Sequence, residues 1–164
     1  MLIVSTSGKK GFHLEGNHQI GLEVVYKNWF SNKAAAAIGP NLIEIGQLDM
    51  WGNRFKIWSN GEEKGLIHFN WKGSIKIDFK DFWGIDRFFV LKQKSIWKPS
   101  YELWDEQDNL IFSIKPIYSW KRLKQTFEIS DIRPNYHDIT LTELTYYSVY
   151  TIKIRMQKKA AAAS

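Results

Sequence analysis

The stretch LTELTYYSVYTIKIRMQKK, residues 141–159, decides how the rest of the chain must be arranged. A helix built from it is apolar on more than one side, and a helix that is apolar nearly all round has to be buried. The seventeen residues from Leu141 to Gln157 would span about 25 Å as a helix. A strand of about eight residues at ~3.3 Å per residue is equally long. The stretch therefore predicts a helix buried along the axis of a β-barrel.

The helical interpretation competes with a strand. Thr140 and Glu143 have the spacing of a capping box, in which the N-cap hydroxyl and the carboxylate three residues later satisfy free backbone amides. The Lys-Lys-Ala tail also favours a helix. However, Tyr150 to Gln157 alternates and is rich in β-branched residues, which is typical of a strand. We expect the helix over residues 141–157, keep the strand as the alternative, and assign no role to the tail, residues 160–164.

The chain before this stretch alternates apolar and polar residues with period two, the pattern of half-buried strands. Turn residues such as Asn60-Gly61 separate the alternating segments, because Asn and Gly tolerate the positive φ of tight hairpins. Candidate strands lie at 20–26, 34–38, 42–49, 54–58, 65–71, 74–79, 85–91, 101–105, 110–117 and 125–130. The series predicts a mainly β, antiparallel sandwich or barrel.

Tryptophan is unusually frequent, with eight residues spread along the chain. Large flat side chains dominate core burial and fit the half-buried face of a pleated sheet. We therefore expect the tryptophans to pack in the core or on a sheet face, rather than to line a groove for sugars or bases. They are Trp29, Trp51, Trp58, Trp71, Trp83, Trp97, Trp104 and Trp120.

Two segments of the chain resemble each other. Residues 50–58 align with residues 96–104 at a constant offset, so that Trp51 matches Trp97. Each segment is followed by a polar turn, a strand, a Trp-Lys pair and an alternating strand. Two copies of a four-element β-unit predict pseudo-repeated halves of one sheet.

Four segments of the second half carry a family resemblance: YELWDEQDNLI (101–111), SIKP (113–116), the aromatic-Ser-Trp-Lys turn (118–121) and TFEI (126–129). They resemble the tubby-like superfamily, which includes the plant LURP-one-related proteins and the phospholipid scramblases. The resemblance covers roughly residues 20–157. It implies a closed antiparallel barrel of about twelve strands around a buried C-terminal helix. The domain would span residues 1–159, with strands over about 11–131 and the helix over about 141–157.

The charge distribution points to an anionic partner. Residues 87–164 carry thirteen basic and eight acidic side chains, against ten and nine in residues 1–86. A basic surplus favours phosphate groups and acidic lipid head groups. Tubby proteins bind phosphoinositides through basic surface residues, so the resemblance implies the same class of ligand. The predicted anion- or lipid-binding residues are Lys92, Lys94, Lys98, Lys121, Arg122 and Lys124.

Motifs for catalysis or metal binding are weak. The absence of cysteine excludes disulfides, thiolate ligands and a cysteine nucleophile. The four histidines lack ligand spacing, and the acidic run 105–108 lacks the order of an EF-hand loop and predicts a polar turn. Ser95 and Lys98 have Ser-x-x-Lys spacing, but Pro99 follows and the companion motifs are missing. We expect no catalytic residue, no cofactor and no metal.

Together these observations predict a non-enzymatic binding or scaffold module, cytoplasmic and peripheral at a membrane, whose partner is an anionic lipid head group or another polyanion. Glu143, Lys153 and Arg155 make membrane insertion of the final stretch unfavourable, so we expect no membrane-spanning segment and no lipid flipping. The alternatives are a small-ligand-binding calycin-like barrel, a nucleic-acid-binding β-barrel and an unrecognised hydrolase. Nucleic acid is the less favoured partner. Basic and aromatic residues alternate in segments such as 115–124, as on a base-stacking surface, but a barrel strand with inward rings and outward lysines gives the same pattern. The oligomeric state stays open.

Overall fold

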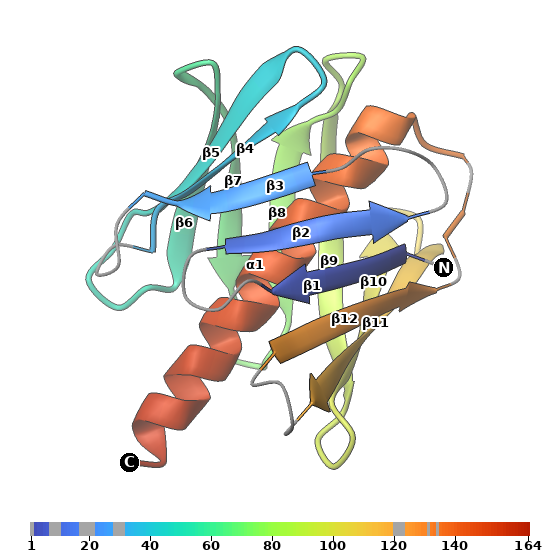
Figure 1. Cartoon of the computed structure of the whole chain (residues 1–164). Helices are drawn as coiled ribbons and strands as arrows, with labels where there is room; N and C mark the ends of the chain where they lie inside the picture. The colour runs from blue at the N-terminus through green and yellow to red at the C-terminus, as the bar shows by residue number, and fades with distance from the viewer. Residues whose placement is uncertain are drawn as a thin grey trace.

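A computed structural model provides the fold (Figure 1). The structure describes residues 2–6, 11–16, 22–27, 32–119, 124–130, 132–133 and 135–164. In these ranges the chain forms twelve β-strands and one C-terminal helix. The strands are β1 (Leu2–Thr6), β2 (Gly11–Gly16), β3 (Leu22–Tyr26), β4 (Ala34–Ile38), β5 (Asn41–Gln47), β6 (Arg54–Ser59), β7 (Glu62–Phe69), β8 (Ile75–Lys80), β9 (Asp86–Ser95), β10 (Ser100–Asp105), β11 (Leu110–Ser119) and β12 (Lys124–Ser130), and the helix is α1 (Asp138–Ala162).

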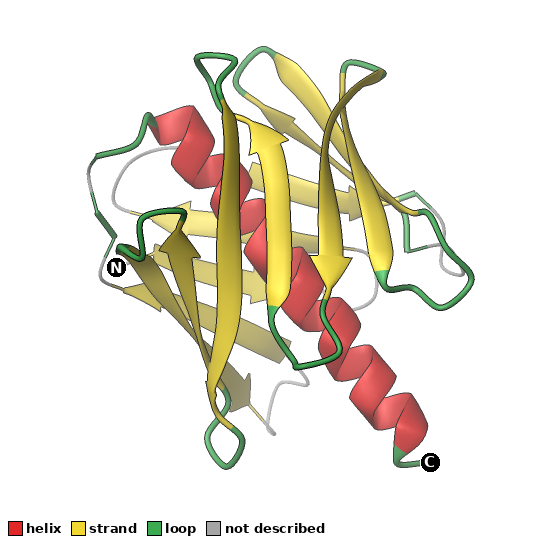
Figure 2. Ribbon diagram, turned by 180° about the vertical axis from the view of Figure 1, so that it is seen from behind, coloured by secondary structure: helices red, strands yellow, loops and turns green. Residues whose placement is uncertain are grey.

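The strands belong to one antiparallel sheet in which sequence neighbours pair, from β2 through to β12. β1 pairs with β12 on one side, where Val4 is opposite Phe127, and with β2 on the other, where Val4 is opposite Leu14. The sheet curves around α1, as the two opposite views show (Figures 1 and 2). The prediction of a mainly β, antiparallel architecture with a C-terminal helix is confirmed. The first strand, β1, lies earlier than the predicted start of the strands near residue 11.

The helix prediction for residues 150–157 is confirmed, and the strand alternative is wrong. α1 begins three residues before the predicted start and continues to Ala162, into the tail. From Glu143 to Arg155 every residue of α1 is buried. Tyr146, Tyr147 and Tyr150 are fully buried despite their hydroxyl groups. The prediction of a helix buried on all sides is therefore confirmed.

The predicted capping box is wrong. His137 is the N-cap, and its Nδ1 accepts the backbone N–H of Ile139 at 3.2 Å. The Thr140 hydroxyl instead accepts the backbone N–H of Phe82 at 3.2 Å, in the connection between β8 and β9. Glu143 forms an ion pair with Lys64 on β7. Tertiary partners thus take the two groups that local spacing assigned to the cap.

Period-two alternation places one face of each strand against α1. On β5 the inward residues are Ile43 and Ile45, and on β8 they are Ile75 and Ile77, all completely buried. Phe55 on β6 contacts the helix directly, with its ring centroid 5.7 Å from that of Tyr150. Because the same face is apolar in successive strands, their burial against the helix drives the sheet to curve around it.

The two similar segments form equivalent hairpins. The first contains the turn into β6, and the second contains the turn into β10. The strand register shifts between Ile57 and Trp58 in the first, and between Leu103 and Trp104 in the second. These irregularities lie at matching positions of the alignment between residues 50–58 and 96–104.

Candidate functional site

Contacts with α1 distinguish two ends of the molecule. At the first, Lys158 donates hydrogen bonds to the backbone carbonyls of Trp51 and Gly52, between β5 and β6. Lys159 donates to the Gln93 side chain of β9 at 3.2 Å. The connections β5–β6, β7–β8 and β9–β10 all lie at this end, where the helix projects beyond the strands (Figures 1 and 2). We call it the exit end, formed by residues 48–53, 70–74, 96–99 and 156–164.

Four lysines at the exit end form what we call the cationic site: Lys72, Lys98, Lys158 and Lys159. Lys72 and Lys98 are exposed in the β7–β8 and β9–β10 connections. None of the four belongs to an ion pair within the part of the chain that the structure describes. The charges of the exposed residues Lys72, Lys98 and Lys159 are therefore available to an external anion. The half-buried Lys158 instead donates to the Trp51 and Gly52 carbonyls and to Asn53 Oδ1, and it contributes positive charge from behind.

Two more cations lie behind this site, in the buried part of α1. The ammonium of Lys153 lies 5.3 Å from the ring centroid of Phe12 and 5.1 Å from that of Tyr26. Burial lowers the pKa of Lys153 to about 8. The guanidinium of Arg155 lies 5.8 Å from the ring centroid of Phe69, and burial lowers its pKa too. Aromatic faces stabilise these cations without neutralising them.

The opposite end of the molecule, where α1 begins, is acidic. Arg87 on β9 is shared there between Asp81 at 3.3 Å and Glu106 at 2.7 Å. The carboxylates of this end come from the β8–β9 and β10–β11 connections, from the strand ends beside them and from the first turn of α1: Asp81, Asp86, Asp105, Glu106, Asp108 and Asp138. Arg87, Lys80 and Arg133 lie at the same end but are fewer than these carboxylates, and the carboxylate of the exit end, Asp49, is paired with Arg54. The two ends of the helix axis therefore differ in net charge.

The acidic run between β10 and β11 is a turn, as predicted. The Asp105 carboxylate accepts the backbone N–H groups of Gln107 at 2.9 Å and Asn109 at 2.8 Å. It also accepts the Tyr136 hydroxyl at 3.0 Å, in the segment leading to α1. Burial alone would raise the pKa of Asp105, but these hydrogen bonds lower it overall. The carboxylate joins a hairpin turn to the start of the helix.

We expect Asp105→Ala to lower the free energy of unfolding by about 1–3 kcal/mol at pH 7, because buried donors lose their acceptor. A folded-state pKa below the unfolded value means that the stabilisation is present above the unfolded pKa and is lost as pH falls. The difference from the unmodified chain should therefore shrink towards pH 3. Urea unfolding at both pH values measures it. Asp86→Ala, at an 84% exposed side chain, is the control and should change stability by no more than about 0.5 kcal/mol.

The structure separates the predicted anion-binding residues. Lys92 lies 4.0 Å from Asp108, and Lys94 lies 2.5 Å from Glu102. Their charges are therefore locally balanced. Lys98 belongs to the cationic site. The remaining predicted residues give no contacts to assess: Lys124 is in β12 without a described side chain, and Lys121 and Arg122 lie outside the described residues.

Sequence reasoning missed three members of the cationic site: Lys72, Lys158 and Lys159. The repeated Trp-Lys pair was a signal for Lys72, because Trp71-Lys72 corresponds in the repeat to Trp120-Lys121, which contains a predicted anion-binding residue. The two helix lysines belong to the basic run at residues 153–159, but local sequence does not show which part of the molecule that run reaches. Their position at the exit end follows from the direction in which α1 passes through the sheet.

The expected burial of the tryptophans is wrong for half of them. Trp51, Trp71, Trp83 and Trp97 are 81%, 91%, 70% and 96% exposed. All four lie in connections between strands, where alternation assigns no inward face. Only Trp58 and Trp104 lie in described strands; both are half-buried, with Lys33 and Lys92 over their rings. Trp29 and Trp120 fall outside the described residues.

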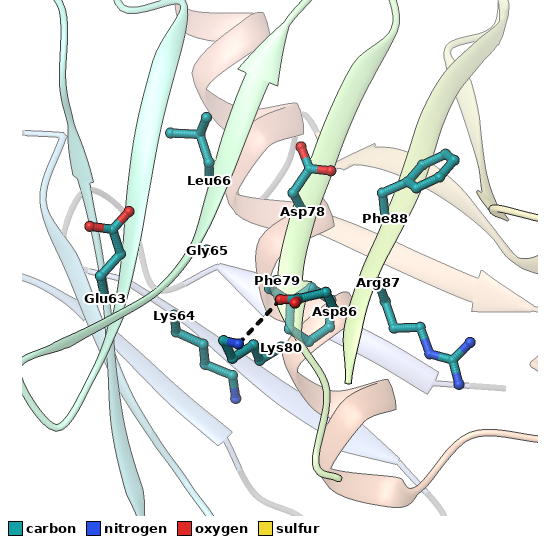
Figure 3. Close-up of a pocket in the computed structure, with 10 residues that line it drawn as sticks. All are labelled: Glu63, Lys64, Gly65, Leu66, Asp78, Phe79, Lys80, Asp86, Arg87 and Phe88. Atoms are coloured by element: carbon teal, nitrogen blue, oxygen red, sulfur yellow. Dashed lines mark ion pairs between the residues drawn. The ribbon is translucent and has the colours of Figure 1, made fainter. Parts of the chain in front are cut away.

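Two grooves contain cations but are balanced in charge. One, of about 380 Å³, lies along β7, β8 and β9 (Figure 3). It is lined by three cations and three carboxylates, including the ion pair of Lys80 with Asp86 at 3.5 Å. The second, of about 330 Å³, lies along β10, β11 and β12 and contains Lys94 and Lys115 beside Glu102 and Glu128. Neither groove has the uncompensated charge of the cationic site.

Other kinds of site have little support. The interior is occupied by the side chains of α1, which leaves the calycin-like alternative without the open centre that a small ligand needs. Within the described ranges, histidines and carboxylates do not gather into groups of three that would hold a metal ion. In the same part of the chain, no helix combines the length and the apolar character that crossing a membrane requires.

Comparison with known proteins found no matching family model, curated protein or solved structure. The tubby-like resemblance therefore rests on the residues quoted above.

Proposed function

We propose that this chain is a non-enzymatic binding module that recognises anionic phospholipid head groups through the cationic site. The observation that carries the proposal is the separation of charge: uncompensated lysines gather at the exit end, and carboxylates gather at the opposite end. A dipole of this kind orients the molecule towards an anionic surface and repels its acidic end from it.

We propose further that the fold is a closed tubby-like barrel with pseudo-repeated halves. The pairing of β1 with both β12 and β2 supports closure. The matching register shifts beside Trp58 and Trp104 support the repeat. A position at the cytoplasmic face of a membrane fits the tubby-like resemblance and the absence of cysteine.

Vesicle flotation tests this function. We expect the chain to bind vesicles of phosphatidylcholine with added phosphatidylserine, and not vesicles of phosphatidylcholine alone. Binding should weaken as salt rises, because ions screen exposed charges. Replacing Lys72 and Lys98 by Gln should weaken partitioning about thirtyfold, since each lysine near an anionic surface contributes about 1 kcal/mol.

The matched control removes the same charge from the opposite end. Lys80→Gln with Arg133→Gln also lowers the net charge by two, at exposed positions close to the start of α1. We expect this variant to bind as the unmodified chain does. Equal recovery of the unmodified chain on neutral and anionic vesicles would contradict the proposal. Equal losses in the two variants would replace a specific site by a general effect of net charge.

A further inference from the structure

Three hairpin connections at the exit end each present an exposed tryptophan. Trp51 lies between β5 and β6, Trp71 between β7 and β8, and Trp97 between β9 and β10, and their exposed fractions are 81%, 91% and 96%. Two of them follow exposed apolar residues, Met50 at 95% and Ile96 at 83%. Single exposed apolar residues are common on protein surfaces. Three exposed tryptophans on hairpins at one end of the molecule indicate a surface that binds a partner.

Hydrogen-bonded turns hold these side chains outward. At the β5–β6 connection, the Asp49 carboxylate accepts the backbone N–H of Asn53 at 2.8 Å, and Lys158 binds the Gly52 carbonyl. At the β7–β8 connection, the backbone N–H of Asn70 donates to the Ser74 carbonyl at 2.9 Å. At the β9–β10 connection, the backbone N–H of Lys98 donates to Ser95 Oγ at 3.2 Å. The tryptophans are thus presented by ordered turns.

Cations accompany the tryptophans. Lys72 and Lys98 directly follow Trp71 and Trp97, and the Lys72 ammonium lies 5.4 Å from the Trp71 ring centroid. Lys158 and Lys159 belong to the last turns of α1 at the same end, where they donate hydrogen bonds to Gly52 and Gln93. Tryptophan beside lysine suits the boundary between lipid head groups and acyl chains, because the ring enters the boundary while the ammonium remains near phosphate.

The geometry favours a bilayer over a folded protein partner. The three rings stand on separate connections with lysines among them, whereas aromatic anchors of protein interfaces cluster at the centre of one patch. A fluid bilayer surface accommodates separate insertions without matching their spacing. The positive exit end also complements an anionic leaflet.

We infer that Trp51, Trp71 and Trp97 insert into the interfacial region of an anionic bilayer, so that the molecule stands on its exit end with α1 pointing towards the membrane. This inference rests on the proposed head-group binding and adds to it the depth and the orientation of the bound molecule.

Fluorescent labels at the two ends test the orientation. The chain has no cysteine, so Ile96→Cys and Ile85→Cys each create a unique labelling position. Ile96 is beside Trp97 at the exit end, and Ile85 is near Trp83 at the opposite end. With phosphatidylserine-containing vesicles, an environment-sensitive label at position 96 should shift to shorter wavelength and be quenched by nitroxide lipids. The label at position 85 should keep its aqueous emission.

Alanine substitution tests the energetic contribution. The triple variant Trp51→Ala, Trp71→Ala and Trp97→Ala should partition into vesicles at least about tenfold more weakly. Without the three rings, less apolar surface is removed from water when the molecule binds. The salt dependence of its remaining binding should be unchanged, since the lysines are intact. Trp83→Ala is the matched control and should bind normally.

The outcomes separate the two proposals. If the unmodified chain does not prefer anionic vesicles, the proposed function fails and the inference fails with it. If it prefers them in a salt-dependent way while the label at position 96 stays in water, or while the triple variant binds normally, only the inference is overturned. Equal spectral shifts at positions 85 and 96 also overturn it. Thermal unfolding of each variant checks that the fold is retained.

Discussion

Replacing Lys64 by Met should lower the free energy of unfolding by about 3–5 kcal/mol, because it leaves the carboxylate of Glu143 buried without its cation. Glu143 on α1 is fully buried, and the Lys64 side chain is only 11% exposed. The second carboxylate oxygen, Oε2, has no hydrogen-bond partner among the described residues. Glu143→Leu should lower the free energy of unfolding by a similar amount, because it leaves the Lys64 ammonium buried without its carboxylate. The double variant Lys64→Met with Glu143→Leu should be within about 1 kcal/mol of the unmodified chain, or more stable.

The pH dependence of stability shows that Glu143 is the group left unpaired in Lys64→Met. Burial raises the pKa of Glu143, and the hydrogen bond and charge of Lys64 oppose this rise. A carboxyl group whose pKa is raised in the folded state binds more protons there than in the unfolded state. Its contribution to the free energy of unfolding therefore becomes less favourable as pH rises above the unfolded-state pKa of about 4.3. The cost of Lys64→Met should therefore be larger at pH 8 than at pH 4.

Urea unfolding of the four proteins in this cycle measures the coupling. The exposed pair of Lys80 and Asp86, with side chains 55% and 84% accessible, is the control. Its disruption by Lys80→Met should cost about 0.5 kcal/mol or less. Additive losses in the double variant at Lys64 and Glu143 would show that the two groups do not depend on each other.

Phe55→Ala should also lower the free energy of unfolding by about 3–5 kcal/mol. Phe55 is completely buried between β6 and the helix, and its ring centroid lies 5.6 Å from that of Phe69 and 5.7 Å from that of Tyr150. Truncation leaves a cavity at the contact that joins strand and helix. Trp97→Ala removes a larger ring, yet it should change stability by no more than about 0.5 kcal/mol, because that ring is 96% exposed.

Thermal and denaturant unfolding of both variants measure this contrast. A loss of several kcal/mol on Trp97→Ala would place the ring in a packed environment and restore the original expectation for the tryptophans. A loss below about 1 kcal/mol on Phe55→Ala would contradict the close packing of β6 against α1.

Much of the fold could be predicted from sequence because several strands alternate apolar and polar residues. In segments such as residues 54–58 and 74–79, period two determines which side chains face the core, and the buried residues Phe55, Ile57 and Ile77 follow it. The final helix could be predicted because its apolar residues surround it and require burial. These signals depend on local spacing alone, so they can be recognised without knowing which residues are close in space.

What failed depends on contacts between distant parts of the chain. The capping box was wrong because the Thr140 hydroxyl accepts a hydrogen bond from Phe82, 58 residues earlier. The turn tryptophans were wrong because a connection between strands has no regular inward face. The candidate site was predicted only in part, because strand register decides which lysines meet a carboxylate: Lys94 meets Glu102 across β9 and β10, whereas Lys98 in the next turn meets none in the described ranges.

The position of α1 has a consequence for synthesis on the ribosome. The residues that fill the sheet are translated after all twelve strands. Until Tyr146 to Tyr150 leave the exit tunnel, the inner faces of the strands have no counterpart to exclude water. The nascent chain therefore has no packed core until residues 146–150 have left the tunnel, and a product stalled before that point would expose apolar surface that aggregates or binds chaperones.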